Sequence, residues 1–305
     1  NIASTLASLL VGRSSISPNF GKSGSEKKQS VLLIIERNFD PRPPFIHDLT
    51  LEPMARDILD VKNNCIEFNK NTKDSFKLYF DASDPVWQSL RYKHIADVMS
   101  EVNTKITELN TTKKLEVTGE NMSVSSLRKL MTKYPAYRVE FRRYQGLMML
   151  DIALLEKYKS NDISSIAKIE QNLATNETIT GEPVPDNPVL LANLLEDITS
   201  PTDKFRLIAL FALKKDNGLT KPLFEKLVEI SHIDFAKKCL SALQILGFPI
   251  IEDSTSKRPR PLPRCPYDAT VSTGYDDSRY IPIIWDILRR LTGQNLDETL
   301  FPFMG

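Results

Sequence analysis

Residues 84–113 read DPVWQSLRYKHIADVMSEVNTKITELNTTK, and this stretch decides the fold. Its apolar residues mostly recur three or four positions apart, which predicts one long amphipathic helix. Asp84 is a typical N-cap, and Pro85 suits the first helical position. We expect the helix to end near Lys113. The residues that set its period are Trp87, Leu90, Ile95, Val98, Met99, Val102, Ile106 and Leu109.

A second helical pattern follows a polar stretch that contains Gly119. Ser123 can cap this helix, which carries Leu127, Leu130, Met131 and Tyr134. Proline lacks an amide hydrogen and clashes with the preceding turn, so we expect the helix to kink or stop at Pro135. The apolar period resumes from Phe141 to Leu155. Residues 85–158 are therefore predicted to form a helical hairpin with a joint at Pro135.

The segments on either side of the hairpin contain shorter elements. Residues 31–35 form a continuous apolar run, typical of a strand covered on both faces in a parallel sheet. Thr50 is the expected N-cap of a helix that runs to about residue 60, and residues 65–69 and 75–80 read as a β-hairpin. Short helices are predicted at 163–174, 188–198, 202–215, 221–231, 234–246 and 281–291, with a basic, proline-rich loop at 252–278.

Composition describes an ordinary globular chain of 305 residues, long enough for two domains. The 40 Lys and Arg against 39 Asp and Glu give a net charge of +1, which excludes a generally basic nucleic-acid binder. No uncharged run approaches the roughly 20 residues that span a bilayer. Three cysteines without metal-binding or disulfide spacing favour a reducing, cytosolic location. The start at Asn1, without a basic signal segment, leads us to expect a piece of a longer protein.

No catalytic signature is found in the sequence. His47, His94 and His232 lack metal-ligand spacing, and structural histidines are the favoured interpretation. Residues 21–23 read Gly-Lys-Ser, but Ile16 stands where the first glycine of a phosphate-binding loop belongs. We therefore expect neither an enzyme nor a metal or cofactor site.

A basic face is predicted on the second hairpin helix. Between residues 127 and 145 six cations accompany a single acid, Glu140, for a local charge of +5. An acidic helical partner, anionic lipid and RNA all fit this face, as does simple solvation, and a protein partner is favoured. The cations are Arg128, Lys129, Lys133, Arg138, Arg142 and Arg143.

A second candidate binding segment lies in the proline-rich loop. Arg260, Pro263 and Pro266 fit the RxxPxxP pattern that polyproline-binding domains dock. An extended linker explains the same residues.

Several segments resemble, in the same order, the SM family of SNARE regulators, the Sec-one/Munc-eighteen-like proteins. Residues 47–50 are more similar to the exocytic, plasma-membrane branch of that family than to its vacuolar or Golgi branches. The segments are Leu32-Leu33-Ile34-Ile35-Glu36-Arg37-Asn38-Phe39-Asp40-Pro41, Pro44-Phe45-Ile46-His47-Asp48-Leu49-Thr50, Asp84-Pro85-Val86-Trp87, Arg91-Tyr92-Lys93-His94-Ile95-Ala96, Lys133-Tyr134-Pro135-Ala136-Tyr137, Lys168-Ile169-Glu170-Gln171-Asn172-Leu173-Ala174 and Ser278-Arg279-Tyr280-Ile281-Pro282-Ile283-Ile284.

The resemblance implies a mainly α fold with minor β structure: a helical domain with a long hairpin, and remnants of an α/β, parallel-sheet domain at both ends. Residues 1–35 would be the end of the second-domain segment and a linker. Residues 36–160 and 161–277 would be the two halves of the helical third domain. Residues 278–305 would return into the second domain.

The resemblance also implies a function, that of a non-enzymatic protein that clasps SNARE helices and promotes vesicle docking and membrane fusion. Its expected partners are a syntaxin-type target SNARE, a vesicle SNARE and the assembled SNARE bundle, without nucleic acid. The expected location is the cytoplasm, peripheral at the plasma membrane through SNAREs. The alternative from another class is a helical scaffold that recruits a partner through residues 257–266.

The resemblance assigns the SNARE contacts to the hairpin. Tyr137, Phe141 and Met148 fall on the surface implied to meet the vesicle SNARE, and Ile106 faces it from the first helix. The hypothesis adds Leu127, Met131, Arg138 and Arg142 as contacts and Pro135 as a hinge between a bent and an extended second helix. Each apolar residue in this set could instead be buried in the hydrophobic core. Burial in the core is the interpretation that we prefer for two further apolar residues of the second helix, Leu130 and Leu147.

Overall fold

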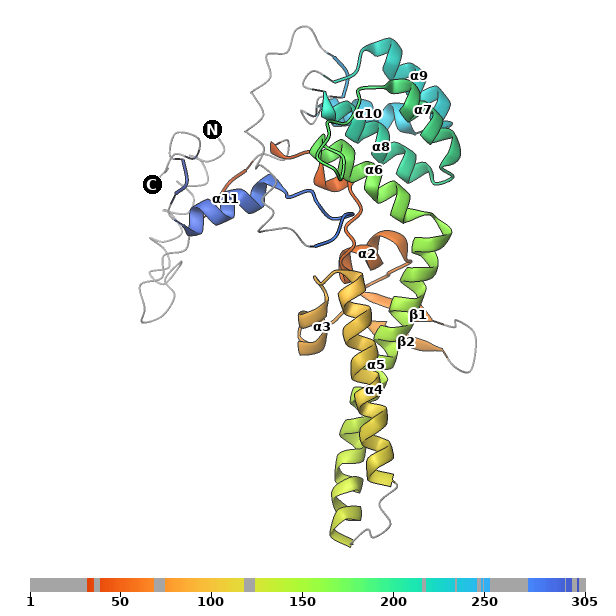
Figure 1. Cartoon of the computed structure of the whole chain (residues 1–305), viewed down its shortest axis with the longest axis vertical. Helices are drawn as coiled ribbons and strands as arrows, with labels where there is room; N and C mark the ends of the chain where they lie inside the picture. Colours follow the sequence, from red (N-terminus) through yellow and green to blue (C-terminus); the bar gives the residue numbers. More distant parts are fainter. Residues whose placement is uncertain are drawn as a thin grey trace, which may run out of the picture.

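The computed structural model describes residues 32–35, 39–68, 75–117, 124–215, 218–233, 235–245, 250–252, 274–293 and 295–297, with Phe248 and Phe301. Within residues 110–138 it describes the backbone of the helices but not the side chains. The described part is mainly helical, with one small sheet, as predicted. A long antiparallel helical hairpin projects from a head of shorter helices, and α11 (Ile283–Thr292) lies beside the head (Figure 1).

The predicted first helix of the hairpin is two helices, α3 (Pro85–Leu90) and α4 (Ile95–Val117). The prediction of one continuous helix was wrong because residues 91–95 bond to another part of the chain. The amides of Leu51 and Glu52, at the start of α2 (Leu51–Ile58), donate to the carbonyls of Lys93 and Arg91, at 3.0 and 2.9 Å. A contact between distant segments thus ends α3 and allows α4 to begin on a new axis.

The second helix of the hairpin, α5 (Val124–Ser160), runs through Pro135 without stopping. Of the two outcomes expected at Pro135, a kink or a stop, the stop does not occur. A proline removes only its own amide donor, and the hydrogen bonds of the turns on either side continue the helix. The side chain of Pro135 lies outside the described part of the chain.

The predicted β-hairpin is confirmed: β1 (Cys65–Phe68) pairs antiparallel with β2 (Phe76–Tyr79), and Cys65 lies opposite Tyr79. The strand predicted at 31–35 is not formed by the described residues 32–35. Leu32 and Ile34 are 62% and 43% exposed, and no neighbouring strand in the described ranges is placed to pair with them. A strand pattern without a partner strand cannot complete its hydrogen bonds.

The head is built from five helices at the predicted positions. Proline stands at the first position of two of them, after the caps Asn187 and Ser200, whose side chains accept backbone amides. The helices are α6 (Ile163–Thr175), α7 (Pro188–Asp197), α8 (Pro201–Lys214), α9 (Lys221–Ser231) and α10 (Ala236–Ile245), with a short 3-10 helix η2 (Pro43–Phe45) against them.

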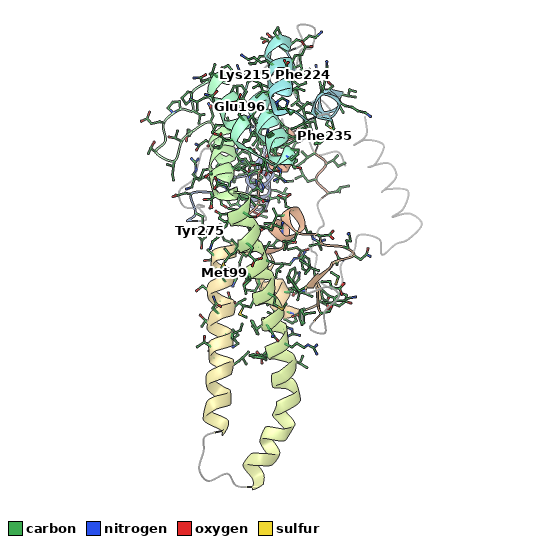
Figure 2. All side chains as sticks on the ribbon, turned by 90° about the vertical axis from the view of Figure 1, so that its right-hand side faces the viewer. Met99, Glu196, Lys215, Phe224, Phe235 and Tyr275 are labelled. Carbon is green, nitrogen blue, oxygen red and sulfur yellow. The ribbon has the colours of Figure 1, made fainter. Side chains whose placement is uncertain are left out.

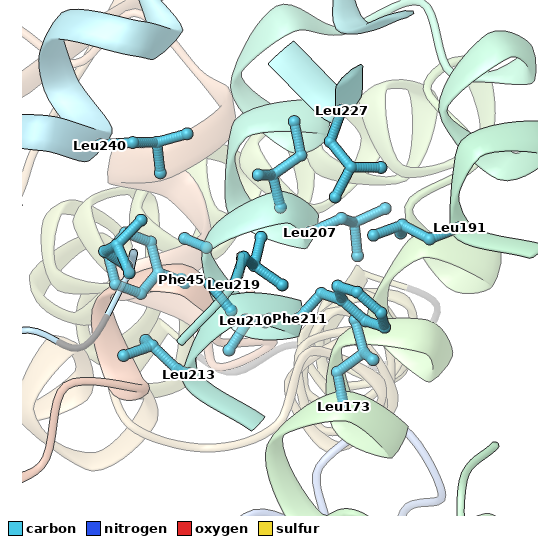
Figure 3. Packing of buried hydrophobic residues seen from close by; sticks show 14 of the residues in the cluster. Phe45, Leu173, Leu191, Leu207, Leu210, Phe211, Leu213, Leu219, Leu227 and Leu240 are labelled. Atoms are coloured by element: carbon cyan, nitrogen blue, oxygen red, sulfur yellow. The ribbon is translucent and has the colours of Figure 1, made fainter. Parts of the chain in front are cut away.

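Two hydrophobic cores hold these elements. The head core surrounds α8, whose residues 207–213 are all buried, and includes Phe45 from η2 (Figure 3). The hairpin core joins α2, the sheet and α3 to the bases of α4 and α5, and Leu147 is buried in it as predicted. Leu130 lies outside the described side chains. The division into the four sequence segments stays a prediction.

Helix α6 carries a buried carboxylate that joins the two cores. Glu170 is fully buried, and its carboxylate accepts the His47 amide at 2.8 Å and the His47 ring Nδ1 at 2.9 Å. Arg206 donates to the other ring nitrogen at 2.7 Å, and a guanidinium cannot accept a hydrogen bond. The ring proton therefore sits on Nδ1. Arg206 also binds Asp57 of α2, at 2.5 Å.

The next residue of α6, Gln171, ties in the C-terminal segment. Its side-chain oxygen accepts the amides of Arg279 and Tyr280 at 2.9 and 2.6 Å. The carboxylate of Asp40 accepts the Tyr280 hydroxyl at 2.6 Å and the Ile283 amide, at the start of α11, at 2.9 Å. Three of the segments that carry the family resemblance thus meet around α6.

Glu170→Ala is expected to lower the free energy of unfolding by about 3 kcal/mol, because it strands buried donors of His47 and removes a neighbour of Arg206. Urea denaturation measures the change. The matched control is Glu156→Ala, at an exposed position of α5 that should change stability little. A loss of similar size in both variants would contradict the role assigned to Glu170.

Candidate functional site

The two hairpin helices carry apolar side chains that are only partly buried. Met99 and Ile106 of α4, and Tyr144 and Met148 of α5, pack against the hairpin core without being enclosed by it. Figure 2 places Met99 on α4, near the base of the hairpin. These side chains contribute to the core and remain accessible from outside.

On α5 three apolar residues share one side of the helix. Phe141 and Met148 are half-buried, and Ile152 is 48% exposed. At 100° per residue, their directions fall within roughly 40° of one another. We call Phe141, Met148 and Ile152 the apolar stripe.

The hypothesised SNARE contacts do not all fall on one face. Phe141 and Met148 lie on the apolar stripe, and Ile106 is half-buried on α4. Arg142 is exposed and points about 100° away from the stripe. Leu127, Met131, Pro135, Tyr137 and Arg138 lie on the helical backbone of α5, but their side chains are outside the described part. Arg260, Pro263 and Pro266 are outside it altogether.

The outer face of α4 is mostly acidic. An open hollow of about 450 Å³ is lined by Asp97, Ser100, Glu101, Thr104, Lys105 and Glu108. Lys105 binds Glu108 at 3.0 Å, which raises the pKa of the lysine. Burial between the helices raises the pKa of Tyr144. The two hairpin helices therefore present surfaces of different charge, since the sequence of α5 is basic over 127–145.

A second hollow, of about 440 Å³, lies where the sheet meets α5. It is lined by Ser75, Phe76, Lys77, Val139, Arg142 and Arg143. Gly146 permits this close approach, because a Cβ there would stand 2.7 Å from the Phe76 ring. The basic run 127–145 includes the two arginines, but only the tertiary structure brings β2 beside them.

The base of the hairpin is fixed by polar contacts with distant segments. Tyr275 stacks on His94 with ring centroids 3.6 Å apart and donates to Asp97 at 2.6 Å. The His94 ring, whose Nε2 lies 3.7 Å from an Asp277 carboxylate oxygen, lowers the pKa of Asp277. Asp151 of α5 is 4% exposed, and burial raises its pKa to about 7.

Neither a metal-ligand cluster nor a membrane-spanning helix occurs among the described residues. No group of three His, Cys, Asp or Glu side chains in these residues is arranged to hold a metal ion. No helix within the same ranges is both long and apolar enough to cross a bilayer.

The Sec1 family model matches residues 1–305 of the chain. The chain belongs to the Sec1 family. The resemblance read from the sequence is thereby confirmed. Curated Sec1-family relatives include the protein transport protein sec1 of Dictyostelium discoideum, 26% identical over 90% of this chain and 47% of its own length. The protein transport protein SEC1 of Saccharomyces cerevisiae is 25% identical over 94% of this chain and 42% of its own.

Solved structures of Sec1-family proteins share the fold. The Unc18–syntaxin 1 complex from Monosiga brevicollis matches with a TM-score of 0.77 at 23% identity, over 94% of this chain and 51% of that one. The SM protein Vps45 in complex with the Qa SNARE Tlg2 matches with a TM-score of 0.67 at 18% identity, over 94% and 51%. The chain spans about half the length of the relatives it matches.

Asp151→Asn is expected to flatten the pH dependence of stability. The folded pKa lies near 7, above the unfolded value of 3.8, so the folded state binds more protons and stability falls as pH rises between these values. From pH 5 to pH 8 the wild type should lose about 3 kcal/mol of unfolding free energy that the variant keeps. Urea denaturation across this range measures the difference. Asp197→Asn, at an exposed position, is the control, and parallel curves for wild type and Asp151→Asn would refute the expectation.

Gly146→Ala is expected to destabilise the wild type by about 1 kcal/mol. The added methyl group must displace the Phe76 ring, and the free-energy cost of this displacement exceeds the gain in helix propensity. In a Phe76→Ala background the same change should instead stabilise by about 1 kcal/mol. Thermal unfolding of the four proteins of this double-mutant cycle measures both effects. The same sign in both backgrounds would mean that Phe76 is not the obstacle.

Proposed function

We propose that this chain is a SNARE-binding regulator of vesicle docking and membrane fusion, and that the hairpin of α4 and α5 is its SNARE-binding surface. The observation that carries the proposal is the apolar stripe on a projecting hairpin in a member of the Sec1 family. Two proteins of the same fold were solved with a syntaxin or a Qa SNARE, which supports a syntaxin-type partner.

The geometry of the hairpin suits a long helical partner. Helix α5 has 37 residues and is therefore about 55 Å long. An amphipathic helix binds by laying an apolar face against accessible apolar side chains at helical spacing. The apolar stripe of α5, together with Ile106 on α4, offers such side chains in the half of the hairpin nearer its base.

The proposal assigns the vesicle SNARE to this stripe. Leu127, Met131, Tyr137 and Arg138 would extend the contact toward the tip, whereas Arg142 points to another face. The hairpin would align the vesicle SNARE with the syntaxin-type SNARE and act as a template for the assembled bundle. The protein would then be cytoplasmic and held at the plasma membrane by its SNARE partners alone.

Pro135 is proposed as the hinge that selects between two forms of the hairpin. Helix α5 is continuous through Pro135, as an extended form would require. Ligands shift such an equilibrium only as far as they bind one form better than the other. A vesicle SNARE that contacts side chains on both sides of Pro135 would favour the extended form.

The scaffold alternative depends on residues 257–266, which the described ranges do not include. No contact among the described residues favours it over the hairpin. The proposed function requires no metal or cofactor, because helix binding needs only complementary apolar and charged surfaces.

Ile152→Asp and Met148→Asp are each expected to weaken binding of a vesicle-SNARE cytosolic segment about tenfold or more, since they place a charge on the apolar contact. Isothermal titration calorimetry measures the affinity, with a syntaxin cytosolic segment titrated separately. The matched control is Val189→Asp, which charges an equally exposed apolar residue of α7 in the head. Unchanged affinity in both stripe variants would contradict the proposal. Ile152 is the safer test because its side chain is half-exposed.

A further inference from the structure

The hollow between the sheet and α5 lies on a different side of the helix from the apolar stripe. We call its lining, Ser75, Phe76, Lys77, Val139, Arg142 and Arg143, the basic hollow. Val139 points about 160° and Arg142 about 100° away from the stripe. A ligand in the basic hollow would therefore leave the stripe accessible, so this surface is separate from the proposed SNARE contact.

The floor of the basic hollow is apolar. Val139 is 62% exposed and lines the hollow, so a ligand there can contact its side chain. The ring of Phe76 lines the hollow together with Val139. The ring can lie this close to α5 because Gly146 has no side chain. The volume of about 440 Å³ accommodates a large apolar side chain and its neighbours.

The rim of the basic hollow is cationic, and its three cations differ in how they are neutralised. Arg143 binds Asp84 at 2.9 Å, and Lys77 lies 3.8 Å from Glu67. Arg142 stands over the Phe76 ring, 6.0 Å from its centroid, and forms no ion pair with any carboxylate in the described ranges. Its guanidinium is thus oriented by the ring and retains its capacity for a carboxylate.

We propose that the basic hollow docks a short acidic segment of a protein partner. In this complex an apolar side chain of the segment would pack on Phe76 and Val139, and a carboxylate would pair with Arg142. A single unpaired cation also disfavours an anionic lipid surface, whose recognition uses clusters of several lysines and arginines. With two of its three cations already paired, the hollow offers too little free positive charge for a nucleic-acid backbone.

The probe is a fluorescein-labelled peptide with one phenylalanine flanked by glutamates on both sides, and its affinity for the whole chain is measured by fluorescence anisotropy. Arg142→Glu is expected to weaken binding about tenfold or more, because it replaces a charge-assisted hydrogen bond with repulsion. Val139→Ser is expected to weaken it several-fold through lost apolar contact. Lys157→Glu, an equal charge change at an exposed position of α5, is the control and should leave the affinity unchanged.

Three results would overturn the proposal. One is equal binding of a peptide in which lysines replace the glutamates. Another is an equal loss from Arg142→Glu and Lys157→Glu, which would mean long-range attraction without a site. The third is binding of phosphatidylserine vesicles, lost in Arg142→Glu, in place of the peptide. Titration of Val139→Ser with the vesicle SNARE separates the two functions, because Val139 lies outside the proposed SNARE contacts and this inference predicts unchanged SNARE affinity.

Discussion

The buried carboxylate of Glu170 is the constraint on which the rest of the structure depends. A carboxylate with no exposed surface is stable only when donors surround it, and here the donors come from His47, more than 120 positions away in the chain. The same imidazole accepts a hydrogen bond from Arg206 of α8. One hydrogen-bond network therefore fixes α6, α8 and the segment before α2 relative to one another.

Helix α6 also links the two hydrophobic cores. Ile163 and Ala167, in its first half, belong to the hairpin core, whereas Leu173 and Ala174 belong to the head core. Glu170 and Gln171 lie between these pairs and bind the chain segments that enter and leave the head. The hairpin is therefore anchored through α6, which fixes the base of the hairpin relative to the head.

Because the hairpin is anchored through α6, the different sides of α5 can make different contacts. One side packs on the hairpin core, a second carries the apolar stripe, and a third meets β2 at Gly146. A helix packed on every side, as α8 is in the head, could not present such surfaces. The partial burial of Ile106 and Met148 means that the core and the accessible surface use the same side chains, so stability and binding are coupled there.

The sequence by itself determined the elements whose signals are local. The apolar period located α4 to α10, and the polar caps located the first turns of α2, α3 and α5, because these patterns act within a few residues. The family resemblance assigned Phe141 and Met148 to one binding surface, and helix geometry places both on the same side of α5. Only the tertiary structure decided that α3 and α4 are separate, because the bonds from Leu51 and Glu52 come from outside the pattern. It alone paired His47 with Glu170 and brought Phe76 to Arg142, since contacts between distant segments depend on how the helices pack and leave no local period in the sequence.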